Sequence, residues 1–192
     1  MRIIAALILA VAAIAGHAAV DQSQVMAYRA LIDQDLRLAT TGYRLALANA
    51  AYCDRKERNS GWVIHDVAQY PEVAIAKAAF GFDKPIQVAA VVKDGPAERS
   101  DIKAGDGFVG LDGATLYWPA MPVGKTGYER MASFKQLLGE RFAEKSTLPV
   151  QVSRGGSDVE LALAPPLVCA SDFQIDTDDG LVHEVVRVRE ID

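Results

Sequence analysis

Apolar residues recur at steps of three and four along residues 21–51, and this spacing predicts one long amphipathic helix. The apolar stripe consists of Val25, Tyr28, Ile32, Leu36, Ala39, Tyr43, Leu47 and Ala50. The charged residues Asp33, Asp35, Arg37 and Arg44 lie off this stripe. We therefore expect the apolar face of the helix to pack against the domain that follows it.

Beyond residue 60 the pattern changes to short apolar runs separated by turn residues, which is typical of strands. Two runs with helical spacing interrupt them, so the chain is predicted to be α+β. A Gly-Gly pair at 155–156 joins two alternating runs and predicts a β-hairpin. The predicted strands are 61–67, 86–92, 108–111, 148–154 and 159–164, the predicted helices are 72–80 and 132–143, and the predicted loops are 54–60 and 116–127.

The first 18 residues, MRIIAALILAVAAIAGHA, have the form of a secretory signal peptide. Arg2 precedes an apolar run, and Gly16 and Ala18 are the small residues of a cleavage site after Ala18. The run is short for a membrane span, and an uncleaved anchor is the alternative. We expect a periplasmic or secreted protein with no membrane span after cleavage. The formal net charge of −5 argues against nucleic acid as a partner.

Cys53 and Cys169 are the two cysteines of the chain, and both follow the predicted cleavage site. An even number of cysteines in an oxidising compartment favours a disulfide. We expect a Cys53–Cys169 bridge that ties the C-terminal tail back to the end of the long helix. Two buried free thiols are the alternative.

The stretch from Val91 to Gly113, VVKDGPAERSDIKAGDGFVGLDG, contains a turn, a short polar helix and a Gly-Asp pair between two apolar strands. It resembles bacterial PDZ domains of the HtrA type, which have the same order of elements. The residues that carry the resemblance are Gly95, Pro96, Ala97, Ile102, Lys103, Gly105, Asp106, Asp112 and Gly113. SFKQLL at 133–138 resembles the start of that family's ligand-flanking helix, and VQVSRGGSDVELAL resembles its closing hairpin.

The resemblance implies an α+β fold: a small, partly open PDZ-like β-barrel or sandwich with two flanking helices, preceded here by a long N-terminal helix. The expected divisions are a signal peptide (1–18), the N-terminal helix (19–54), the PDZ-like domain (55–165) and a C-terminal tail (166–192). Gly95, Pro96, Gly105 and Asp106 are expected to be structural turn residues. Gly105 can adopt a positive φ, and Asp106 can accept backbone N–H bonds.

In this family a partner's C-terminal segment adds as a strand beside the long helix, and the resemblance implies the same site here. Residues 59–64 would hold the carboxylate in a nest of backbone N–H groups, with Arg58 adding positive charge and Ser60 standing where the family has an apolar residue. A rival position for this loop is 79–82, Ala-Phe-Gly-Phe. The implied peptide-binding residues are Ser60, Gly61, Trp62, Val63, Ile64 and His65 from the strand and Phe134, Leu137 and Leu138 from the helix.

The sequence contains no complete catalytic set, so we expect no catalytic residues, no metal and no cofactor. The segment His183-Glu184-Val185-Val186-Arg187 has Arg where an HExxH zinc motif needs its second His. The alternating apolar residues around it predict a strand instead. The acidic segment 176–178 is predicted to be a loop.

Two functions from different classes follow from these patterns. The first is an exported, non-catalytic PDZ protein that binds C-terminal or extended segments of envelope proteins by strand addition. The alternative comes from a weak resemblance of the flanks to the front of exported HExxH zinc metallopeptidases. In that case the chain would be the regulatory N-terminal part or the accessory of a periplasmic protease whose catalytic domain is absent from this chain.

Overall fold

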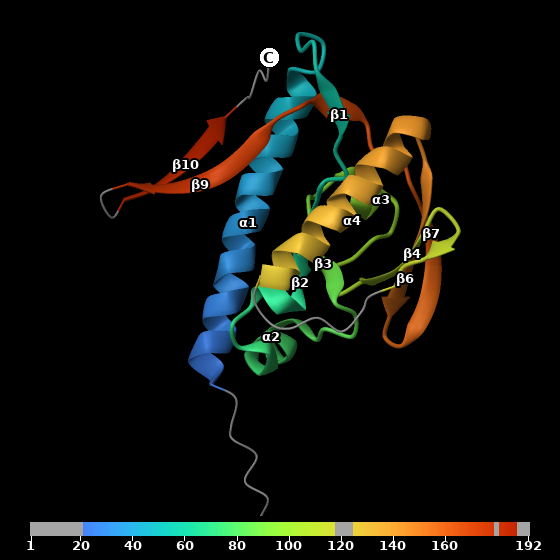
Figure 1. Cartoon of the computed structure of the whole chain (residues 1–192). Coiled ribbons are helices and arrows are strands. Elements are labelled where there is room, and N and C mark those ends of the chain that lie inside the picture. The colour runs from blue at the N-terminus through green and yellow to red at the C-terminus, as the bar shows by residue number, and fades with distance from the viewer. Residues whose placement is uncertain (1–20, 118–124, 179–180, 188–192) are drawn as a thin grey trace, which may run out of the picture.

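The computed structural model describes residues 21–117, 125–178 and 181–187 of the 192-residue chain. The predicted signal peptide lies outside these residues. Figure 1 shows a long helix, α1 (Gln22–Ala48), beside a body of strands and helices, and a two-stranded hairpin that leaves the body past α1. Asp21 caps α1, because its side chain accepts a hydrogen bond from the Ser23 N–H.

An antiparallel sheet forms the body, with the strand order β2-β3-β4-β6-β7 and with β5 paired to β4. The sheet does not close into a barrel, so β2 and β7 are its edges. The α+β class predicted from the sequence is therefore confirmed. The strands are β2 (Trp62–Asp66), β3 (Ile86–Val91), β4 (Gly107–Leu111), β5 (Ala114–Thr115), β6 (Leu148–Arg154) and β7 (Ser157–Leu163).

The main hydrophobic core lies between this sheet and α4 (Lys125–Glu144). Phe134 of α4 contacts Phe108 of β4, with 4.7 Å between the ring centroids. Apolar side chains at alternate positions of the strands complete the core, as expected for a sheet with one covered face. The helix begins at Lys125, earlier than the predicted start at 132.

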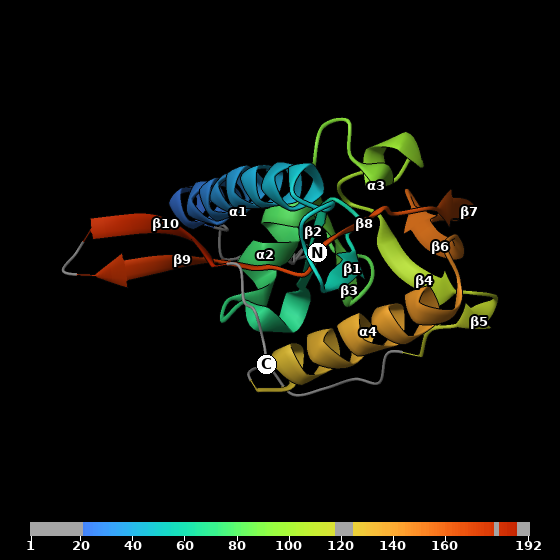
Figure 2. The ribbon, with the colours of Figure 1, turned by 90° about the horizontal axis from the view of Figure 1, so that it is seen from above.

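The helix α1 packs on the opposite side of β2 and β3 from α4, as Figure 2 shows. Its N-terminal half also contacts α2 (Val73–Phe80), where Val25 packs with Ile75 and Ala79. Gly81 ends α2 in the left-handed conformation, with a φ of 65°. A short 3-10 helix, η1 (Val67–Gln69), connects β2 to α2, and α3 (Pro96–Arg99) is the short helix that follows β3.

The apolar stripe of α1 is only partly the one that the spacing predicts. The buried residues of the helix are Val25, Leu38, Gly42, Tyr43 and Ala46, whereas Leu47 is exposed. Near the C-terminal end of α1, Ala46 packs against Val168 and Cys169 of β8, a contact that the spacing in the sequence does not reveal.

Residues 54–60, a predicted loop, contain the strand β1 (Lys56–Arg58), which pairs with β8 (Leu167–Cys169). A disulfide joins Cys53 to Cys169, with 5.5 Å between their Cα atoms. Ala46 of α1 packs against Val168 and Cys169 beside this bridge. The end of α1, the start of the body and the start of the tail are therefore held together.

The C-terminal hairpin consists of β9 (Asp172–Asp178) and β10 (Leu181–Arg187). The predicted strand over 183–187 is confirmed, whereas the acidic segment 176–178 is a strand and not the predicted loop. Across the described ranges, no helix is both long and apolar enough to cross a membrane.

Candidate functional site

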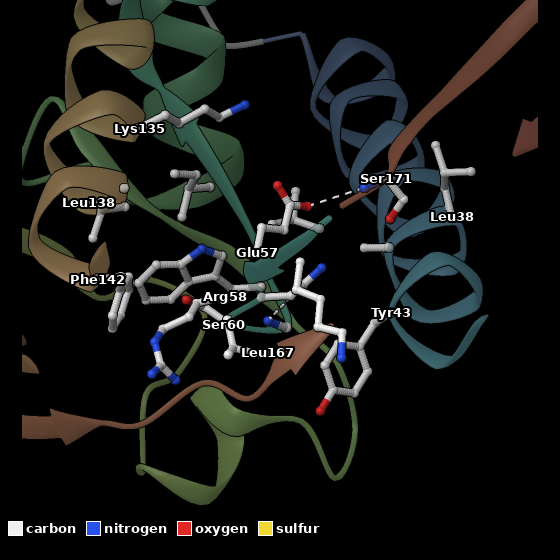
Figure 3. Close-up of a pocket in the computed structure, with 18 of the residues that line it drawn as sticks. Leu38, Tyr43, Glu57, Arg58, Ser60, Lys135, Leu138, Phe142, Leu167 and Ser171 are labelled. Carbon is white, nitrogen blue, oxygen red and sulfur yellow. Dashed lines mark hydrogen bonds between the residues drawn. The ribbon is translucent and has the colours of Figure 1, made fainter. Parts of the chain in front are cut away.

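A groove of about 790 Å³ runs along β2 between α1 and α4. Figure 3 shows Leu138 and Phe142 of α4 on one side of it and Leu38 and Tyr43 of α1 on the other. Residues of β1 and β8 line the end of the groove that lies nearest the disulfide, which we call the closed end. The groove is thus a slot with two helical walls, and β2 forms its floor.

The floor of the groove has an unpaired main-chain edge. Within the described residues β2 pairs with β3 alone. The Gly61 C=O accepts from Val92, and the Val67 N–H donates to Pro85, so both of these groups point toward the β3 side. Main-chain groups alternate along an antiparallel strand. The N–H and C=O groups of Trp62 and Ile64 therefore point away from β3, into the groove.

The side chains of β2 alternate between the two helical walls. Trp62 and Ile64 pack against the core under α4. Val63 and His65 point to the α1 side, as expected from the period of two along a strand. Ser60, Gly61, Trp62, Val63 and Ile64 all line the groove, as the resemblance implies.

His65 does not line the groove. Its side chain is 4% exposed and lies in an aromatic cluster, where its Nδ1 is 2.8 Å from the Tyr70 hydroxyl. The ring also contacts Phe80 and Phe82, with 4.9 Å and 4.4 Å between centroids. Burial lowers the pKa of His65 from 6.5 to about 4, so the ring is neutral at pH 7. His65 follows Ile64, which lines the groove, and its ring lies on the side of β2 that α2 covers.

The wall from α4 differs from the predicted one by a turn of the helix. Leu138, Gly139 and Phe142 line the groove, together with Lys135 and Ala143. Phe134 is buried in the core beneath α4, and Leu137 lies on the far side of the helix. Both of these predicted residues line a second, smaller pocket near β5 instead. Only Leu138 of the three predicted helix residues faces the groove.

The closed end of the groove carries charged side chains, the cations of Lys56 and Arg58 and the carboxylate of Glu57. The Arg58 side chain lines it, and its Nη1 donates to the Pro165 C=O at 2.7 Å. The expected nest of N–H groups is smaller than the resemblance implies, because the Gly61 N–H donates to the Asn59 side chain at 2.9 Å. The Trp62 N–H, which points away from β3, is a main-chain donor near this end.

Gly61 is required by the shape of the turn that leads into β2. Its φ is +65°, and a Cβ there would lie 2.9 Å from Cδ of Pro96. The neighbouring Ser60 C=O accepts from the Ala97 N–H at 2.9 Å. The turn before β2 is therefore packed onto the start of α3, and a larger residue at Gly61 would disturb the fold.

The predicted turn residues lie away from the groove. Gly105 has a φ of +90°, and Asp106 is 1% exposed. The Asp106 side chain accepts from the Lys103 N–H at 2.8 Å and from both Nε and Nη2 of Arg154 at 2.7 Å. Gly95 and Pro96 begin α3, with Pro96 at its first helical position.

A buried ion pair that the sequence did not reveal lies at the C-terminal end of β2. Asp66, at the end of β2, is fully buried and forms two hydrogen bonds with Arg130 of α4, one of them at 2.5 Å from Arg130 Nε. Asp66 also accepts from the Ala68 N–H at 2.8 Å. The pair ties the floor of the groove to its α4 wall.

The rival loop at 79–82 does not border the groove. Gly81 ends α2 there, and Phe80 and Phe82 belong to the aromatic cluster around His65. No group of three or more potential metal-ligating side chains occurs in the part of the chain whose side chains are described.

Among solved structures, the chain is similar to PDZ domains of HtrA-type proteins. No family model matches the chain, and no curated protein matches it. The HtrA3 PDZ domain bound to a phage-derived ligand (FGRWV) is 23% identical, and the match covers 59% of this chain and 89% of that chain with a TM-score of 0.40. The HtrA-type protease AlgW with a decapeptide is 21% identical, and the match covers 58% of this chain with a TM-score of 0.41.

The match to AlgW spans only 30% of the AlgW chain. At these identities and TM-scores, neither match assigns a ligand, a partner or an activity to this chain. Neither match concerns a zinc metallopeptidase, so the expected resemblance of the flanks to that class has no support.

Proposed function

We propose that the chain binds extended C-terminal segments of other proteins by adding them as a strand to β2. The observation that carries this proposal is the unpaired edge of β2 at the floor of a slot between two helices. A strand added there can hydrogen-bond to the free main-chain groups of Trp62 and Ile64, and its side chains can enter the space beside α4 and α1.

Arg58 determines the orientation that we propose for the ligand. Arg58 lies at the closed end, among the residues of β1 and β8 that line the groove there. A terminal carboxylate at this end would form charge-assisted hydrogen bonds with Arg58, while Leu138 and Phe142 would contact the last side chain. We therefore propose that the ligand's C-terminus lies at the Arg58 end and that its chain runs antiparallel to β2.

Gly139 provides a sharp test of the groove. It lines the groove from α4, and a Cβ added there would meet nothing within 4 Å. Gly139→Ala should retain binding, whereas Gly139→Trp should fill the slot and reduce affinity at least tenfold with the fold intact. Gln136→Trp, at an exposed position of α4 outside the groove, is the matched control.

The measurement is fluorescence polarisation with peptides that end in an apolar residue, each with a free and with an amidated C-terminus. We expect the free carboxylate to be required, and Arg58→Gln to reduce the difference between the two forms. Arg37→Gln, which removes the same charge from an exposed position of α1, is its control. Equal binding by Gly139→Trp and Gln136→Trp would contradict the proposal.

We also propose that the protein works outside the cytoplasm, on segments of envelope proteins. The closed Cys53–Cys169 bridge supports this location, because disulfides persist in oxidising compartments. Cell fractionation with N-terminal sequencing tests it. The expected product is a periplasmic or secreted chain that begins at Ala19.

A further inference from the structure

The two walls of the groove carry opposite charges at the same level. On α4, Arg130 contacts Asp66 at the end of β2, and Lys135 lies about 7 Å further along the helix than Arg130. Two residues of a strand span a similar distance, so Lys135 lies beside Ile64 of β2. On α1, Asp35 lies two turns before Tyr43, about 12 Å along the helix axis, and Tyr43 is the lining residue of α1 nearest β1 in the chain. Both side chains line the groove, Lys135 from one wall and Asp35 from the other.

The surroundings of the Asp35 carboxylate favour a ligand that carries a positive charge. It is half-buried, and partial burial raises the pKa of its carboxyl group. No hydrogen bond or ion pair to this carboxylate is found within the described residues. Tyr70 lies near enough for the Asp35 charge to contribute, after burial, to the raised pKa of its hydroxyl. A cation in the groove would compensate the desolvation of Asp35.

The alternation of an added strand decides which of its side chains meets which wall. If the last side chain of the ligand contacts Leu138 and Phe142, every second residue before it also faces α4. The residues one and three places before the last then face α1. Three residues of an extended chain span about 10 Å, which is close to the distance between Asp35 and Tyr43 along the axis of α1.

We propose that Asp35 makes the groove selective for ligands with Lys or Arg three places before the C-terminal residue. This inference rests on the proposed function, since it assumes a strand added along β2. The class of ligand is an extended C-terminal segment with an apolar last residue and a cationic side chain at that position. The α1 wall, which lies outside the PDZ-like body, would thus supply a specificity determinant.

The test uses peptides that differ at single positions and the mature protein with its disulfide closed. One peptide has Lys three places before its apolar last residue, a second has norleucine there, and a third has the same Lys moved to two places before the last. We expect the first to bind about threefold to tenfold more tightly than the second at low salt. The third should gain nothing, because its Lys faces the α4 wall with Lys135.

Asp35→Asn should remove the preference for the first peptide over the norleucine peptide. Asp33→Asn, an exposed residue of the same helix outside the groove, should retain the preference. The comparison of the three peptides on the unmodified protein keeps the test valid if Asp35→Asn folds poorly.

Equal affinity for the Lys and norleucine peptides would overturn the role of Asp35 and leave the proposed function standing. An equal preference in Asp35→Asn would also overturn it. Failure of the unmodified protein to bind any peptide with a free carboxylate would overturn both the proposed function and this inference.

Discussion

His65 is a polar side chain that the fold keeps neutral. It lies among Tyr28, Tyr70, Phe80 and Phe82 at one end of α1, where its Nε2 has no hydrogen-bond partner within the described residues. Protonation would place a charge in this aromatic cluster, where the Tyr70 hydroxyl is 2.8 Å from Nδ1. The folded state therefore resists protonation of His65, whereas the unfolded chain does not.

The stability of the protein should fall in mild acid because of His65. Its pKa is about 4 in the folded state and 6.5 as its ordinary value, so the unfolded chain gains a proton first as the pH falls. The stabilisation is complete above pH 6.5 and is lost between about pH 6.5 and 4, by an amount on the order of 3 kcal/mol. Urea unfolding of the unmodified protein and of His65→Phe, at pH 7 and pH 4.5, measures it. The variant should lose less stability over this range, and an equal loss in both would contradict the assignment.

At the scale of elements, the Asp66–Arg130 pair holds β2 against α4. Both side chains are almost completely buried, so the loss of one partner removes a countercharge from a site with little access to water. The pair lies at the C-terminal end of β2, whereas β1 comes before the start of that strand. Its geometry therefore fixes the spacing between the strand that a ligand would join and the helix that its side chains would contact.

Asp66→Asn should lower the free energy of unfolding by about 3–5 kcal/mol. The exposed pair between Lys103 and Asp101 is the matched control, with side chains that are 59% and 61% exposed. Lys103→Met should change the free energy of unfolding by no more than about 1 kcal/mol. Urea unfolding of the two variants measures the difference, and similar values would show that the buried pair contributes no more than a surface pair.

The sequence correctly predicted the structural features that depend on local patterns. The Gly-Gly hairpin, the Gly-Asp turn and the alternating strands all depend on neighbours within a few residues, and they lie where the spacing placed them. The pairing of Arg58 with Leu167 joins segments too far apart for any local pattern, so β1 was predicted as a loop. The sequence also predicted that Phe134 and Leu137 line the groove, whereas Gly139 and Phe142 line it instead, and this difference has another cause. An apolar helix face gives no information on which of its edges borders solvent.

At the scale of the whole molecule, the disulfide fastens α1 to the body and to the tail. The bridge spans 116 residues of sequence, and it lies beside the packing of Ala46 on Val168. The two-stranded β1–β8 sheet would be marginal without such support, since so short a pair of strands is unstable alone. The closed end of the groove therefore depends on the bridge for its position.

Reduction of the bridge should destabilise the protein and weaken peptide binding. Loss of the cross-link restores the freedom of the unfolded chain, which costs roughly 4–5 kcal/mol for a loop of this length. Urea unfolding with and without dithiothreitol measures the change. The double variant Cys53→Ser, Cys169→Ser should have the stability of the reduced protein and should not respond to the reductant. A reduced protein as stable as the oxidised one would contradict this account.

The second wall of the groove should affect the residence time of a ligand as well as the selectivity of binding. A strand held against α4 alone would keep one side in water, but a strand between α4 and α1 is covered on both sides. Such a ligand must leave along the slot or wait for the walls to separate. Differences between good and poor ligands should therefore lie mainly in their residence times, while their association rates remain similar.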